Sequence, residues 1–196
     1  MIELRASAPG KLVLCGEYAV LTGGPAVVAA VNRRATSVLG ELRGASCEMH
    51  IANSGVTRQF DCLKDGSLRW LDEPGSDGAI LTAVIATLNA HGIWRPPDET
   101  FRIVLDSRHF FAATRVGDQH KLGLGSSAAV SAAVTGSLLR LLGADMDYSL
   151  FHEAHSRLQQ GRGSGIDVAS SFFGGVIAYT RSPGQIAEVR ELGWPR

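Results

Sequence analysis

Hydrophobic and polar positions alternate over short stretches in the first third of the chain. Short runs of alternating or β-branched residues, broken by Gly, Pro or Asn, are typical of strands. They predict strands at residues 3–8, 11–15, 26–31, 35–42, 46–52 and 56–62. Further strands are expected at 101–105, at 172–179 with a glycine interruption, and in a last run ending at Leu192. A sheet built largely from the N-terminal third is therefore expected.

Apolar residues three and four positions apart predict helices later in the chain. Residues 77–90 have this spacing, and residues 126–142 form a small-residue helix that Gly143 ends. Asp147 is a suitable N-cap for a further helix that runs to about residue 160, where Gly161 follows. Strands followed by helices, rather than strict alternation, favour an α+β fold. No composition shift divides the chain into two domains.

The composition indicates one globular domain with a substantial core. The chain has 196 residues, of which 45% are hydrophobic and 19% are charged. Basic and acidic residues balance at 19 each, so no nucleic-acid partner is expected. The three cysteines have no disulfide or zinc-site spacing, and the N-terminus has no signal-peptide pattern. We therefore expect a cytoplasmic protein that binds neither nucleic acid nor a membrane.

Glycine is over-represented and clustered, at 23 residues or about 12% against a usual roughly 7%. The first cluster surrounds the sequence Ala-Pro-Gly-Lys-Leu-Val-Leu-Cys-Gly-Glu-Tyr, residues 8–18. Strand alternation places Lys11 and Val13 on one face, with Lys11 beside the Pro-Gly turn at the mouth of the sheet. A surface lysine at a strand start explains the same pattern equally well.

The sequence Lys-Leu-Gly-Leu-Gly-Ser-Ser-Ala-Ala, residues 121–129, opens the small-residue helix. Two glycines let backbone N–H groups point into a common hollow, and the helix N-terminus adds partial positive charge. A phosphate group, and hence a nucleotide, is the expected ligand. An ordinary glycine loop with a serine cap is the alternative. A dinucleotide fingerprint from Gly123 to Ala128, with Asp145 as its acid, is a weaker one, because a helix rather than a strand follows.

The third glycine-rich stretch, residues 161–175, contains Asp167 directly after a tight turn. Such a loop holds a carboxylate rigidly, and a lysine ammonium beside a carboxylate keeps it ionised. Asp167 and Lys11 are therefore a candidate working pair. A helix-capping aspartate is the alternative interpretation.

These three stretches, in this order, resemble the motifs of the GHMP kinases, ATP-dependent kinases of small molecules. The resemblance runs from about residue 5 to 180. The sequence Gly16-Glu17-Tyr18 resembles the phosphomevalonate kinase branch, since mevalonate kinases usually have Gly-Glu-His there. The implied fold is the α+β N-terminal domain of the family (ribosomal protein S5 domain 2-like). It has a mixed sheet, helices on one side and a left-handed βαβ crossover.

The resemblance also implies ATP and Mg²⁺ as cofactors and a role for each motif residue. Asp167 would orient or deprotonate the attacking oxygen, and Lys11 would keep Asp167 ionised and offset charge on the transferring phosphoryl group. The residues that would cradle ATP are Lys121, Gly123, Leu124, Gly125, Ser126, Ser127 and Ala128. The residues that would lie near a phosphomevalonate or mevalonate-like acceptor are Glu17, Tyr18, Arg162 and Ser164.

Two departures from the family pattern change this picture. Ser156 stands where mevalonate kinases carry a Mg²⁺-binding glutamate, so Glu153 is the candidate replacement beside the Ser126 and Ser127 hydroxyls. Residues 1–196 are expected to form one N-terminal, ATP-binding domain without the family's C-terminal domain. A homodimer or a partner chain would then supply the missing half. The alternative is a non-catalytic nucleotide-binding module derived from such a kinase.

Overall fold

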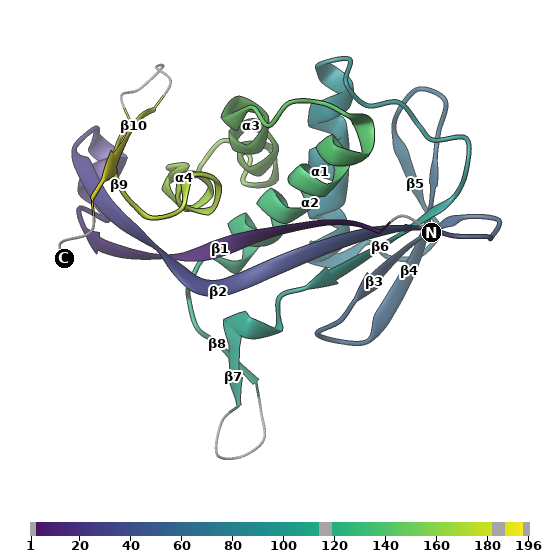
Figure 1. Cartoon of the computed structure of the whole chain (residues 1–196), viewed down its shortest axis with the longest axis horizontal. Coiled ribbons are helices and arrows are strands. Elements are labelled where there is room, and N and C mark those ends of the chain that lie inside the picture. Colours follow the sequence, from purple (N-terminus) through teal and green to yellow (C-terminus); the bar gives the residue numbers. More distant parts are fainter. Residues whose placement is uncertain (1–2, 114–118, 182–186, 194–196) are drawn as a thin grey trace.

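The computed structural model describes residues 3–113, 119–181 and 187–193. One mixed sheet forms the base of the molecule, and the four α-helices lie together on one of its faces (Figure 1). The sheet order is β10-β9-β2-β6-β3-β4-β5, with β1 paired to β2. The sequence therefore predicted the α+β class, the mixed sheet and the one-sided helical layer correctly.

A long antiparallel pair, β1 (Leu4–Cys15) and β2 (Pro25–Glu41), spans the whole sheet. The short 3₁₀ helix η1 (Ala19–Thr22) joins the two strands. The sequence predicted two separate strands for each of these, which is wrong. Pro9 and Gly10 introduce only a shift of register, and β1 continues past them. Lys11 is thereby held in the middle of a strand rather than at its start.

The other edge of β2 pairs with two strands that come from distant parts of the chain. Residues 36–41 pair with β6 (Phe101–Asp106), and residues 25–29 pair with β9 (Val176–Thr180). The remaining strands of the sheet are β3 (Cys47–Ile51), β4 (Val56–Cys62), β5 (Leu68–Trp70) and β10 (Glu188–Leu192). The β3–β6 pair is parallel and the other pairs are antiparallel, so the sheet is mixed.

The helices are α1 (Gly75–Ala90), α2 (Ser126–Leu142), α3 (Tyr148–Leu158) and α4 (Ile166–Phe173). The bounds predicted for α2 agree with the structure. The sequence missed α4, because Phe172 and Phe173 belong to that helix and not to the strand expected at 172–179. It also missed β5, η2 (Arg108–Phe110) and the hairpin of β7 (Phe111–Ala113) and β8 (Gln119–Lys121). This hairpin projects from the face of the sheet opposite the helices (Figure 1).

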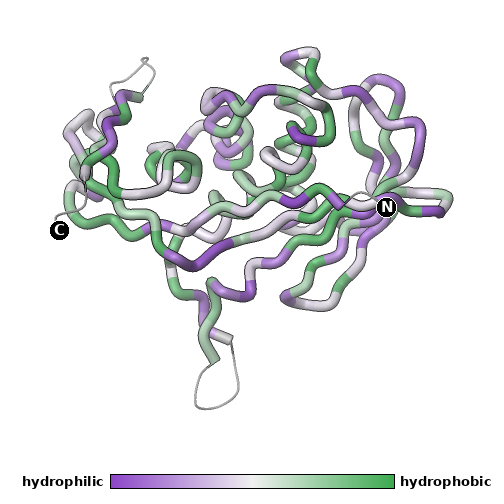
Figure 2. The backbone as a smooth tube through the Cα atoms, in the orientation of Figure 1, coloured by the Kyte–Doolittle hydropathy of each residue, from purple (hydrophilic) through white to green (hydrophobic). Residues whose placement is uncertain are grey.

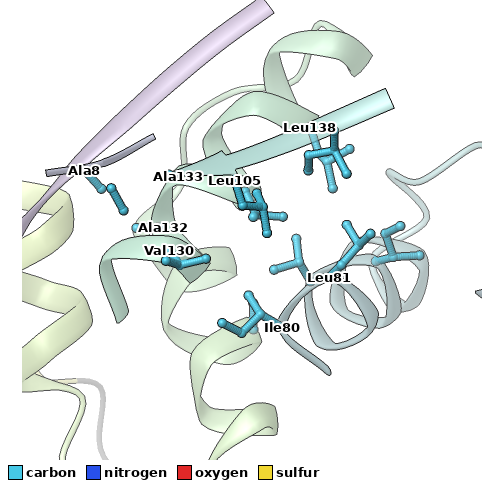
Figure 3. Close-up of a cluster of buried hydrophobic side chains, with 14 of the residues drawn as sticks. Ala8, Ile80, Leu81, Leu105, Val130, Ala132, Ala133 and Leu138 are labelled. Carbon is cyan, nitrogen blue, oxygen red and sulfur yellow. The ribbon is translucent and has the colours of Figure 1, made fainter. Parts of the chain in front are cut away.

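The core lies between the sheet and the helices. Hydrophobic and hydrophilic residues are interspersed along the strands (Figure 2). In β6, residues 101, 103 and 105 are buried, whereas residue 102 is exposed. Figure 3 shows Leu105 from the sheet beside Ala133 and Leu138 of α2 and Leu81 of α1. Small residues let α2 approach β1 closely, and every residue from 128 to 139 is buried. Among the described residues, no helix is long and apolar enough to cross a membrane.

Candidate active site

Lys11 and Asp167 come together although they are distant in sequence. The Lys11 Nζ lies 3.1 Å from the Asp167 Oδ1, and the two side chains are 14% and 32% exposed. Lys11 extends from β1, and Asp167 lies in the first turn of α4. A partly buried ion pair of this kind is screened less by solvent than a surface pair. The pairing of Lys11 with Asp167 predicted from sequence is therefore present in the structure.

The loop before α2 is fixed directly against Lys11. The Lys11 backbone N–H donates to the Leu124 carbonyl at 2.9 Å. Gly123 and Gly125 have φ values of +70° and +74°, in the left-handed region that favours glycine. A Cβ on Gly125 would lie 3.0 Å from the Lys11 Cγ, so the lysine stem packs on this glycine. Lys11 therefore connects the glycine loop with the carboxylate of Asp167.

The first turn of α2 ends the same loop. Gly125 is the N-cap, Ser126 is buried and Ser127 is half-buried. The first N–H groups of a helix have no partner within the helix, and the helix dipole favours an anion there. Ala128 contributes only backbone here, because its side chain is buried in the core.

A hollow of about 420 Å³ adjoins this helix start. Lys121, Ser126 and Ser127 line it. Asp77 from the first turn of α1 and Asn53 from the β3–β4 turn also line it, and neither was singled out from sequence. Asp77 precedes an apolar run at helical spacing, so the sequence identified it only as the start of a helix. The volume is within the range of small-molecule sites.

Glu153, the carboxylate expected near the metal, is engaged elsewhere. Its oxygens lie 2.8 Å from the His91 Nε2 and 2.8 Å from the Arg157 Nη2. His91, followed by Arg157, holds the pKa of the Glu153 carboxyl below its ordinary value. In residues 3–113, 119–181 and 187–193, no group of three His, Cys, Asp or Glu side chains is arranged to hold a metal ion. The metal role of Glu153 stays a prediction.

The residues expected near the acceptor lie in two segments, the turn after β1 and the loop before α4. Glu17 and Tyr18 are exposed in the turn after β1, and Tyr18 is 81% exposed. Arg162 is exposed, while Ser164 is half-buried two residues before α4, where its Oγ accepts from the Ile166 N–H at 3.4 Å. Of these four residues, Ser164 has the most defined position.

This geometry suits a protein that binds a phosphorylated small molecule beside a lysine and a carboxylate. Residues 79–175 match the family described as the GHMP kinases N terminal domain. The family resemblance seen in the sequence is thereby confirmed, and the chain carries the N-terminal domain of a GHMP kinase. A helix, α3, follows α2, so the glycine loop is not part of a dinucleotide-binding βαβ unit.

Relatives of known name give the same family. The mevalonate kinase of Thermococcus gammatolerans is 32% identical over 189 residues, which cover 92% of this chain and 52% of that protein. The phosphomevalonate kinase of Saccharolobus solfataricus is 26% identical over 178 residues, covering 89% and 48%. The crystal structure of the Lin0012 protein from Listeria innocua superimposes with a TM-score of 0.76 at 26% identity, covering 99% and 58%. The chain thus spans about half the length of the curated relatives that it matches.

Proposed function

We propose that this chain binds ATP and takes part in phosphoryl transfer to a small acceptor of the mevalonate type. The observation that carries the proposal is the position of Lys11. The Lys11 backbone N–H donates a hydrogen bond to the Leu124 carbonyl, and the aliphatic part of its side chain packs on Gly125. Its ammonium group lies 3.1 Å from the Asp167 carboxylate. One residue therefore links the expected phosphate site to the expected acid–base group.

Each part has a role that its chemistry supports. The N–H groups of the loop and of the first turn of α2 bind the ATP phosphates. Asp167 accepts the proton of the attacking acceptor oxygen, and Lys11 keeps Asp167 ionised and offsets charge on the phosphoryl group. Positioning and charge neutralisation are most of what phosphoryl transfer requires of a protein.

A magnesium ion fits the oxygen donors that line the hollow. Mg²⁺ prefers carboxylate and hydroxyl oxygens together with phosphates and water. The Ser127 hydroxyl and the Asp77 carboxylate line the same hollow beside the helix start, whereas Glu153 is paired with His91. Ser127 and Asp77 are therefore the residues that would hold the ion, which supplies charge neutralisation at the phosphates.

The acceptor is mevalonate or phosphomevalonate. Relatives with both names match the chain, and mevalonate kinase is the more frequent name. The branch indicated by Gly16-Glu17-Tyr18 is that of phosphomevalonate kinases. We assign Ser164, Arg162, Glu17 and Tyr18 to the acceptor, because Ser164 and Arg162 lie in the loop that leads to Asp167 and Glu17 and Tyr18 follow the strand that carries Lys11.

The test is ADP release from Mg-ATP by the wild-type chain, with mevalonate and phosphomevalonate supplied separately. Asp167→Asn is expected to lower kcat at least about 100-fold, the usual scale of general-base catalysis, while ATP binding persists. The matched control is Asp98→Asn, the same chemical change at an exposed position, which should behave as the wild type. ATP binding without acceptor-dependent ADP would instead indicate a nucleotide-binding module.

A further inference from the structure

The loop of residues 161–165, which leads into α4, is held by two side chains from the far end of the sheet. The Tyr179 hydroxyl donates to the Ser164 carbonyl at 2.6 Å. The Arg181 guanidinium donates through Nη1 to the Gly163 carbonyl. Tyr179 belongs to β9, and Arg181 directly follows that strand. The carbonyls of two successive residues before α4, Gly163 and Ser164, are thus fixed by β9 and by the residue that follows it.

Tyr179 is itself rigidly anchored. Its side chain is completely buried and packs in a small cluster with Val28, Ile166 and Ile177. Burial raises the pKa of the Tyr179 phenol, so the hydroxyl remains a proton donor at physiological pH. Because the Tyr179 ring is fixed in the packed core, its hydroxyl also fixes the position of the Ser164 carbonyl to which it donates.

The 161–165 loop also lacks space to move toward β9. Gly165 has a φ of +82°, and a Cβ there would lie 2.7 Å from both the Tyr179 hydroxyl oxygen and the His152 Nε2. The backbone therefore passes against these two side chains without a gap. A loop packed this closely has one position relative to Tyr179.

Asp167 follows Gly165 by two residues, so the loop sets where the α4 carboxylate lies. The opposite end of α4 is attached to β1 by a hydrogen bond of its own, which the Ser171 hydroxyl donates to the Pro9 carbonyl at 2.8 Å. One end of the helix is thus fixed to β1, next to Lys11, and the other end to β9. The 3.1 Å approach of Asp167 to Lys11 depends on both attachments.

We propose that Tyr179 and Arg181 are positioning residues for the phosphoryl transfer, which hold the 161–165 loop so that Asp167 and Ser164 face the acceptor correctly. This inference rests on the proposed function. Neither side chain needs to contact ATP or the acceptor. Their effect passes through the two loop carbonyls to the start of α4.

The test compares Tyr179→Phe with Thr87→Val, which removes a buried hydroxyl from α1 and keeps the branched shape of the side chain. The Thr87 hydroxyl has no hydrogen-bond partner among the described residues, so its loss should leave the 161–165 loop unchanged. Steady-state kinetics and amide hydrogen exchange at residues 163–167 are measured for both. Tyr179→Phe is expected to lower kcat about tenfold with an unchanged KM for ATP, since small misplacements of reacting groups are costly. Exchange in the loop should accelerate, and Thr87→Val should match the wild type in both measurements.

The outcomes separate this inference from the proposed function. Wild-type kcat and wild-type loop exchange in Tyr179→Phe would overturn the positioning role. An equal loss of kcat in Thr87→Val would also overturn it, because the effect would then be a general effect of losing a buried hydroxyl. If Tyr179→Phe does not fold, Arg181→Gln, which removes the second bond at a half-buried site, replaces it with the same criteria. If the wild type transfers no phosphoryl group, the proposed function fails, while loop exchange still decides whether Tyr179 holds the loop.

Discussion

Gly10 shows how one missing side chain brings two motifs together. A Cβ at this position would lie 2.5 Å from the Leu124 carbonyl oxygen and 2.5 Å from the Phe110 ring. Neither atom is the free end of a flexible side chain. The absence of a side chain at residue 10 thus allows the hydrogen bond between the Lys11 N–H and the Leu124 carbonyl in the glycine loop before α2.

We expect Gly10→Ala to lower the free energy of unfolding by about 1–3 kcal/mol, the usual cost of overpacking. ATP affinity should fall as well, because the Lys11–Leu124 bond must lengthen. Urea unfolding and nucleotide titration measure the two effects. Gly40→Ala is the control, since a Cβ on that β2 glycine would meet no atom within 4 Å. Equal stability of the two variants would contradict the close approach at Gly10.

The site residues differ in how far the sequence alone predicted them. Glycines at 123 and 125 followed by two serines indicate a phosphate loop through local backbone chemistry. The Lys11–Asp167 contact was inferred from charge and glycine context. The sequence did not identify Asp77 or Tyr179 as residues near the site, because their proximity to it depends on how α1 and β9 pack. Local chemistry is readable from sequence, whereas proximity across the fold is not.

At the scale of elements, α2 is attached to the sheet by a buried polar contact as well as by small-residue packing. The Ser37 and Ser137 hydroxyl oxygens lie 2.8 Å apart, and both residues are fully buried. Ser137 also donates to the Val134 carbonyl at 3.0 Å, so Ser37 is the donor between the two serines. Loss of Ser137 therefore leaves a buried hydroxyl unpaired, whereas loss of Ser37 does not.

Ser137→Ala is expected to destabilise the fold by about 1–3 kcal/mol, the cost of an unpaired buried hydroxyl. Ser37→Ala should cost less, and the double variant should be more stable than Ser137→Ala alone. Chemical denaturation of the three variants supplies the free energies. Additive effects of the two substitutions would exclude the direct interaction.

The sequence identified α2 well and α4 poorly for a physical reason. A long run of small apolar residues bounded by glycines defines α2 without tertiary information. The eight residues of α4 are too few to reveal a period, and they end in two phenylalanines that also suit a strand. In β2, Asn32, Arg33 and Arg34 interrupt the alternation, yet pairing with β1 keeps the strand continuous. Tertiary contacts thus override local preference in both places.

At the scale of the whole molecule, the two histidines of α3, one buried and one half-buried, couple stability to pH. His155 is 2% exposed, and its Nε2 has no hydrogen-bond partner. Burial lowers the pKa of His155, although the nearby Asp167 opposes this effect, and burial also lowers the pKa of His152. The folded protein therefore resists protonation that the unfolded chain accepts near pH 6.5.

The free energy of unfolding should accordingly be at its full value above about pH 6.5 and decrease as the pH falls through the folded-state pKa values. Carboxylates with lowered pKa values, such as Asp106, stay ionised between pH 7 and 5. They therefore do not change the free energy of unfolding over this pH range. Denaturation across this range should show a shallower dependence in His155→Leu than in the wild type. Identical slopes would show that His155 does not couple stability to pH.

The pairing of Pro25 with Thr180 joins two segments from opposite ends of the described chain. A chain that emerges from the ribosome N-terminus first forms the β1–β2 hairpin early, yet part of β2 must wait for β9. Tyr179, which hydrogen-bonds the loop before α4, leaves the ribosome long after β2 does. The hold of β9 on this loop can therefore form only after the β1–β2 hairpin is already made.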